Sequence, residues 1–184
     1  MSRFGRGVGR TVAIAIVLAL LAPGAATSRG EKRSRLDTFT GSCEFKATVR
    51  FTPPLSGEQQ QTHADALGVG KCSGTWDSRR GSWRLDGDEV LYKAHSDGTQ
   101  SCASAEVPGE GLLKYRGRTL RFRLFEQRVG AQAELELTGV RGGRLSATAA
   151  PEGDPVAAVR SCAGEGLAES KAVISGETDP SISG

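Results

Sequence analysis

The residues best placed to do chemistry are the two histidines and their neighbours. His95 is followed by Ser96 and Asp97, which together supply the three residue types of a nucleophilic triad. Adjacent residues of a strand point to opposite faces of a sheet, so His95 and Ser96 are not expected to meet. His63 borders a glutamine-rich loop in an unrelated segment. We therefore interpret both histidines as surface residues beside turns.

A second chemical candidate is a group of carboxylates in the stretch RLDGDEV. Asp86, Asp88 and Glu89 could form a glycosidase pair. The Asp-Gly pair within this stretch is instead typical of a hairpin turn, and the EF-hand spacing of a calcium site is missing. The chain also lacks CxxC, HxxxH and GxSxG motifs. We therefore predict no catalytic residue, no metal ligand and no cofactor. We also predict that the protein is not an enzyme.

Charged and apolar residues alternate in the stretch Thr119–Leu137, TLRFRLFEQRVGAQAELEL. Arg121 and Arg123 come first, and Glu134 and Glu136 follow after a glycine. We expect a hairpin whose arginines and glutamates share the outer side of a sheet and oppose each other. Such pairs stabilise a hairpin by roughly 0.2–1 kcal/mol each and cancel each other's field. The row is therefore interpreted as a solvated sheet face and not as a site for a polyanion.

Two tryptophans flank the stretch DSRRGS. Trp76 and Trp83 could stack on a carbohydrate, but tryptophan more often packs in a core or at its rim. We favour packing for both.

The N-terminal residues 1–26 have the layout of a secretory signal peptide. They contain a basic region, an apolar stretch shorter than the roughly 20 residues that span a bilayer, and small residues before the cleavage site: Arg3, Arg6, Arg10, Thr11–Ala22 and Ala26. A polar linker is expected over 27–36. Removing the leader also removes three positive charges, which equals the formal charge of +3 of the whole chain. The mature chain is then neutral, which argues against nucleic acid as a partner.

The mature chain carries four cysteines, at Cys43, Cys72, Cys102 and Cys162. In an exported protein an even number of cysteines predicts disulfides. Three pairings are possible, and we prefer Cys43–Cys72 with Cys102–Cys162. The expected location is secreted, with no membrane contact after cleavage and an unknown extracellular partner or ligand.

Alternation with a period of two residues runs through almost all of the chain after the leader. It predicts an all-β domain over 37–176, built from about nine to eleven short strands in one antiparallel meander barrel or a β-sandwich. Pro53 and Pro54 are expected to break a strand. Asp86–Gly87 and Asp97–Gly98 are expected to form hairpin turns. No helix is expected, and residues 177–184 are left as a C-terminal tail.

The stretches GSCEFKATVRFTPPL, GKCSGTW and the closing DPSISG resemble a group of uncharacterised secreted proteins of high-GC Gram-positive bacteria. The resemblance covers nearly the whole mature chain. It implies export and an all-β body, and it carries over no activity and no functional residue.

Three functions are compatible with these features. The first is a disulfide-stabilised, non-enzymatic binding or structural module. The second is a carrier that holds a small apolar ligand inside the barrel, which predicts a cavity of roughly several hundred cubic ångströms. The third is an extracellular hydrolase, which requires convergent polar groups in a cleft.

Overall fold

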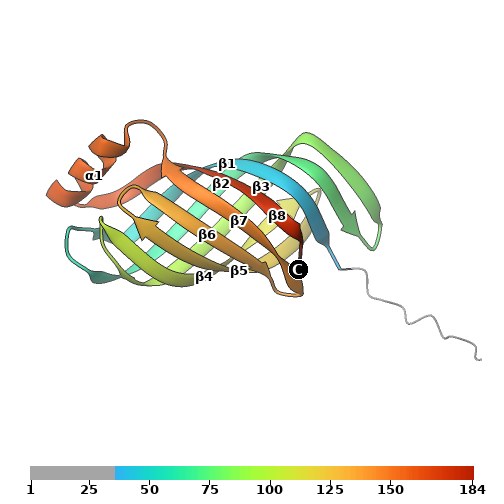
Figure 1. The fold of residues 1–184 in the computed structure, drawn as a ribbon, viewed down its shortest axis with the longest axis horizontal. Helices are drawn as coiled ribbons and strands as arrows, with labels where there is room; N and C mark the ends of the chain where they lie inside the picture. Colours follow the sequence, from blue (N-terminus) through green and yellow to red (C-terminus); the bar gives the residue numbers. More distant parts are fainter. Residues whose placement is uncertain (1–35) are drawn as a thin grey trace, which may run out of the picture. The chain divides into compact units, whose positions relative to one another are not determined.

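A computed structural model describes residues 36–184 as a closed antiparallel β-barrel with one short helix (Figure 1). The predicted signal peptide 1–26 and nearly all of the predicted linker 27–36 lie outside the described residues. Within 36–184, no helix has the length and apolar character needed to cross a membrane.

The barrel wall follows the order of the chain. Each strand pairs antiparallel with the next, and the last strand returns to pair with the first. In the sequence, the helix α1 (Pro155–Gly164) comes between the last two strands. The strands are β1 (Thr38–Leu55), β2 (Gln60–Ser78), β3 (Gly81–Gln100), β4 (Ser104–Tyr115), β5 (Arg118–Val129), β6 (Gln132–Gly139), β7 (Gly142–Pro151) and β8 (Leu167–Ser183).

The expected all-β meander is confirmed, and the barrel is found in place of the sandwich. The expected strand number was too high, because both Asp-Gly pairs lie inside β3. Gly87 has a φ of 72° and faces a register shift between Cys72 and Ser73. The conformational freedom of glycine therefore permits a β-bulge here. Gly98 faces the interior, where a Cβ atom would lie 2.5 Å from a methyl group of Val107.

The two prolines do not break β1, contrary to the prediction. The pairing of β1 with β2 ends at Thr52, and its pairing with β8 shifts register between Arg50 and Leu55. Pro53 and Pro54 therefore lie where the ladder requires no N–H group from them.

The prediction that no helix follows the leader was wrong. Asp154 caps α1 by accepting a hydrogen bond from the Val156 N–H at 2.9 Å, and Pro155 occupies the first turn. An acidic cap followed by proline is a common start of a helix. Residues 177–183, set apart as a tail in the sequence, continue β8 up to the pair between Ser183 and Thr38.

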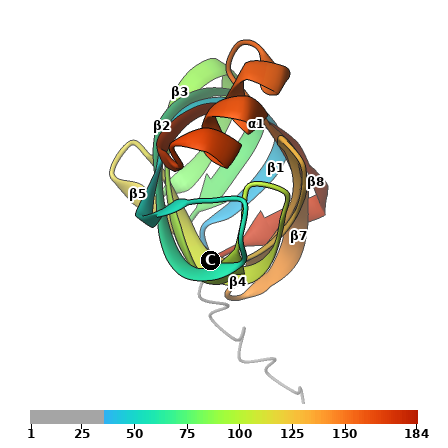
Figure 2. The ribbon, with the colours of Figure 1, turned by 90° about the vertical axis from the view of Figure 1, so that its left-hand side faces the viewer.

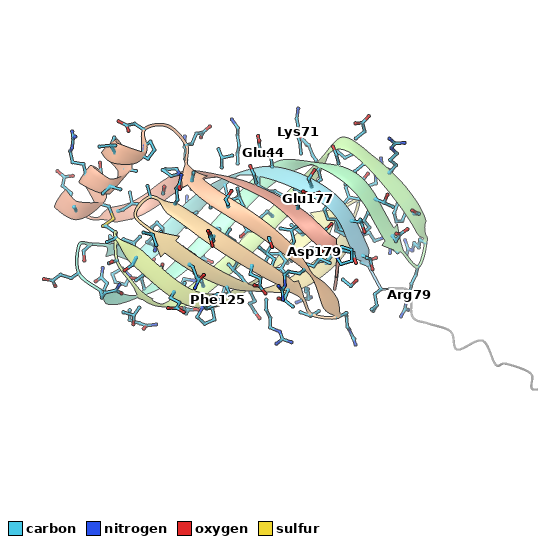
Figure 3. All side chains as sticks on the ribbon, in the orientation of Figure 1. Glu44, Lys71, Arg79, Phe125, Glu177 and Asp179 are labelled. Carbon is cyan, nitrogen blue, oxygen red and sulfur yellow. A yellow bond between two sulfur atoms is a disulfide. The ribbon has the colours of Figure 1, made fainter. Side chains whose placement is uncertain are left out.

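The expected opposition of arginine and glutamate on β5 and β6 is not found. The tight turn after Val129 sets the register so that Glu136 faces Phe125 and Arg123 faces Thr138. Glu136 instead forms an ion pair with Arg144 of β7 at 3.2 Å. The charged residues do lie on the outer surface, as does Phe125, whose side chain points away from the barrel (Figure 3).

Aromatic rings fill the end of the barrel away from α1. Phe39 and Tyr115 both pack against Trp76, with ring centroids 6.0 and 5.7 Å apart. Tyr92 lies between Phe45 and Phe122, at 5.2 and 6.0 Å. Inward-facing glycines make room for these rings. A Cβ atom on Gly70 would lie 2.3 Å from Phe45, and one on Gly111 would lie 2.6 Å from Phe122.

Two disulfides are present, with the preferred pairing. Cys43 and Cys72 are directly opposed on β1 and β2 and lie in the core. Cys102 and Cys162 connect the segment between β3 and β4 to α1. The first bond therefore crosslinks the wall, and the second ties the helix to the barrel end.

Removing the wall disulfide should destabilise the fold. The bond closes a loop with a sequence separation of 29 residues, for which the chain-entropy estimate is about 3.6 kcal/mol. The variant Cys43→Ala/Cys72→Ala should lose about that free energy of unfolding in urea titrations. An unchanged unfolding midpoint would contradict a disulfide at this position.

Candidate functional site

The interior of the barrel contains a cavity at the end nearest α1. Its volume is about 120 Å³. Figure 2 looks onto this end and shows α1 lying across part of the opening. Small side chains at inward positions of several strands leave this space unfilled, whereas the opposite end holds bulky rings. These small residues are Ala64, Ala66, Ala94, Ser96, Ala133, Ala149 and Ala172.

The cavity has an aromatic floor and a helical cover. Tyr92 lines the cavity on the side of the aromatic core, and its exposed fraction is 2%. Ala158 and Val159 of α1 line it on the helix side, together with both sulfur-bearing residues of the Cys102–Cys162 bond. The disulfide thus holds the cover against the barrel.

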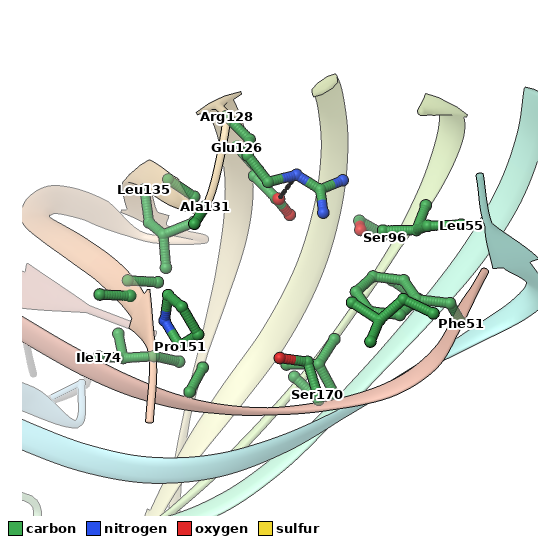
Figure 4. A pocket seen from close by; sticks show the side chains of 18 of the residues that line it. Phe51, Leu55, Ser96, Glu126, Arg128, Ala131, Leu135, Pro151, Ser170 and Ile174 are labelled. Atoms are coloured by element: carbon green, nitrogen blue, oxygen red, sulfur yellow. Dashed lines mark ion pairs between the residues drawn. The ribbon is translucent and has the colours of Figure 1, made fainter. Parts of the chain in front are cut away.

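A pair of opposite charges lies on the wall of the cavity (Figure 4). Glu126 and Arg128 of β5 continue the inward series that begins with Leu120, Phe122 and Leu124. Arg128 Nε lies 3.5 Å from Glu126 Oε1, and the two side chains are only 11% and 16% exposed for arginine and glutamate respectively. Two charged residues therefore occupy positions where the pattern of the strand places core residues.

Arg128 is held in place by neutral neighbours. Its Nη2 donates a hydrogen bond to Gln100 Oε1 at 2.8 Å, and Gln100 in turn donates to the Thr62 carbonyl at 3.3 Å. Gln100 is fully buried. The guanidinium also lies 5.7 Å from the ring centre of Phe51. These contacts fix the position of the charge at the cavity wall.

Burial dominates the electrostatics of this pair. It raises the pKa of Glu126, an effect that the charge of Arg128 partly opposes. Burial likewise lowers the pKa of Arg128, opposed by Glu126. The pKa of Tyr92 is raised, first by burial and then by the charge of Glu126. Since buried ion pairs rarely repay their loss of hydration, stability alone does not account for the pair.

The two histidines lie together on the outer surface, although the sequence placed them in unrelated segments. The register of β2 and β3 pairs His63 with Asp97 and Asp65 with His95. Protonated His63 donates from Nδ1 to Asp97 at 2.7 Å and from Nε2 to Asp65 at 3.1 Å. The hydrogen bond with Asp97 is the largest cause of its raised pKa.

The positions and contacts of the other candidate residues are those of structural residues. His95 faces outward and Ser96 inward, as expected for adjacent strand residues. Asp88 accepts hydrogen bonds from the Asp86 N–H and the Tyr115 hydroxyl. Trp76 is fully buried. Among the described residues, no group of three or more histidine, cysteine, aspartate or glutamate side chains could hold a metal ion.

Glu126 and Arg128 were missed in the sequence, although the signal was present. The alternation that puts Leu120, Phe122 and Leu124 inside also places the two charges inside if it is continued to the end of the strand. Alanines at inward positions of several strands are the matching signal for a cavity.

Comparisons with known proteins assign no function to this chain, so a functional assignment depends on the geometry of the cavity. No family model matches the sequence, no curated protein is significantly similar, and no solved structure matches the fold. The resemblance to exported proteins of high-GC Gram-positive bacteria therefore stays a prediction.

Replacing both charges should cost little stability, whereas replacing one should cost much. Glu126→Leu leaves the buried guanidinium of Arg128 charged and without its partner. This should lower the free energy of unfolding by about 3 kcal/mol. Glu126→Leu/Arg128→Met removes both charges and should be neutral or more stable by up to about 4 kcal/mol. Urea titration of both variants measures this difference. A double variant less stable than the single one would show that the pair stabilises the fold.

Asp97 should control the titration of His63. Asp97→Asn should bring the pKa of His63 down toward 6.5, and by more than Asp65→Asn does, because Asp97 is the larger cause of the shift. The stabilisation from this contact is present below the ordinary pKa and is lost as the pH rises through the folded value. Histidine ring signals in an NMR pH titration report it, and equal shifts in both variants would contradict the assigned geometry.

Proposed function

We propose that this protein is an exported, non-enzymatic binding domain that holds one small, mostly apolar molecule inside the barrel. The observation that carries the proposal is the partly covered cavity, whose walls are mainly small and apolar side chains with one charged pair among them. Eight-stranded barrels are just wide enough to be filled by side chains or to hold one small ligand. Two disulfides support export, because such bonds persist in oxidising surroundings.

The size of the cavity limits the ligand. Its volume of about 120 Å³ is below the several hundred cubic ångströms that we expected for a carrier. An engineered apolar cavity of about 150 Å³ binds benzene. The ligand, or the part of it that enters the barrel, is therefore on the scale of a single ring.

The arrangement of polar groups favours binding over catalysis. Ser96 and Ser170 line the cavity, but no hydrogen bond among its lining residues joins either hydroxyl to a base. A serine nucleophile requires such a base. A purely structural module is less favoured, because it would gain from filling the space that the inward alanines leave open.

Binding of benzene tests this function. The oxidised protein should bind it saturably, with NMR shift changes centred on methyl groups of Ala94, Ala133 and Ile174. Ala133→Leu fills the cavity from a wall position that is 8% exposed, and it should weaken binding by about tenfold or more.

Ala157→Leu is the matched control, because Ala157 lies on the exposed side of α1 and adds the same side chain outside the cavity. It should leave binding unchanged. Absence of saturable binding to the native protein, or equal affinity of both variants, would contradict an interior site.

A further inference from the structure

The charged pair at the cavity wall has unused hydrogen-bonding capacity. No group among residues 36–184 donates a hydrogen bond to the Glu126 carboxylate. Arg128 Nε is buried without a hydrogen-bond acceptor, since its 3.5 Å approach to Glu126 is an ionic contact and too long for a good hydrogen bond. An acceptor and a donor thus lie side by side at a cavity whose lining is mainly apolar and also includes Ser96, Ser170 and Tyr92.

A hydroxyl group complements this arrangement. It donates one hydrogen bond, which the carboxylate of Glu126 accepts, and it accepts another, which Arg128 Nε donates. Bonds to charged partners are stronger than those between neutral groups, so one hydroxyl satisfies two groups whose burial is costly.

The charge of the site favours a neutral ligand. Glu126 and Arg128 sum to zero and sit within 3.5 Å of each other. A carboxylate or an ammonium group brought beside them would leave one charge without a partner next to two largely buried side chains. The site therefore discriminates against both acids and amines of similar size.

The remaining surfaces suit a compact apolar body. Phe51, Leu135 and Ile174 contribute apolar surface to the lining (Figure 4). Tyr92 lines the cavity on the side of the aromatic core. The volume of about 120 Å³ matches one ring with a single polar substituent and excludes a long chain.

We propose that the Glu126–Arg128 pair selects a small neutral hydroxyl compound, of the size and character of a phenol, as the ligand of the barrel. This inference rests on the proposed function. It adds the polar group that the ligand must carry and the two residues that recognise it.

Affinities of the native protein for four probes of similar size test the selection. Phenol should bind at least about tenfold more tightly than benzene at neutral pH, a difference of about 1.4 kcal/mol. Benzoate and benzylammonium should each bind at least about tenfold more weakly than phenol. Isothermal titration calorimetry or NMR shift titration gives all four constants without any variant.

A double substitution locates the origin of the preference. In Glu126→Leu/Arg128→Met, the ratio of phenol to benzene affinity should fall to about one, because the two hydrogen bonds are gone. The matched control is Glu136→Leu/Arg144→Met, which removes an ion pair of 3.2 Å on the outer surface. It should leave the ratio as in the native protein.

The outcomes separate the two proposals. If benzene binds and phenol gains nothing, the polar selection is wrong and the interior site stands. If benzoate binds most tightly with proton uptake, the pair recognises an anion and the selection is also wrong. If none of the four probes binds, both the polar selection and the proposed function are wrong. Should the double variant not fold, the ratios of the native protein still decide.

Discussion

The pairing of β8 with β1 is the constraint on which the rest of the structure depends. It turns a string of hairpins into a closed wall and thereby gives every strand an inner and an outer face. Closure also removes the exposed strand edges that invite aggregation. Once the wall is closed, a residue's place in the alternation decides whether it meets water or the interior. The two charges at the end of β5 are buried because of this geometry.

The interior has one end filled by rings and one end that contains a cavity. At one end, rings from several strands pack around Trp76 and Tyr92, and glycines on neighbouring strands admit them. At the other, alanines leave a cavity that α1 partly covers, and a disulfide ties α1 to this end of the barrel. Tyr92 belongs to both parts, since it stacks in the core and forms the floor of the cavity.

The fold was largely predictable from the sequence because alternation is local, and the departures have physical causes. Gly87 and Gly98 signal turns in isolation, but pairing with β2 continues before and after each of them and keeps both within one strand. The helix was missed because its alanine-rich sequence has little periodic pattern, although its cap was visible. The site was harder to predict, since a cavity depends on which inward residues of distant strands meet. The register that separates Arg123 from Glu136 likewise follows from the turn between the strands and not from the charges.

A cavity that accepts a small guest in the interior of the barrel is the central claim, and a crystal structure of the protein under xenon pressure tests it most directly. Xenon enters apolar cavities of this size. The account predicts one strong xenon peak between Tyr92, Ala133 and Ala149, beneath α1. A barrel end filled by repacked side chains, or xenon bound solely on the outer surface, would contradict it.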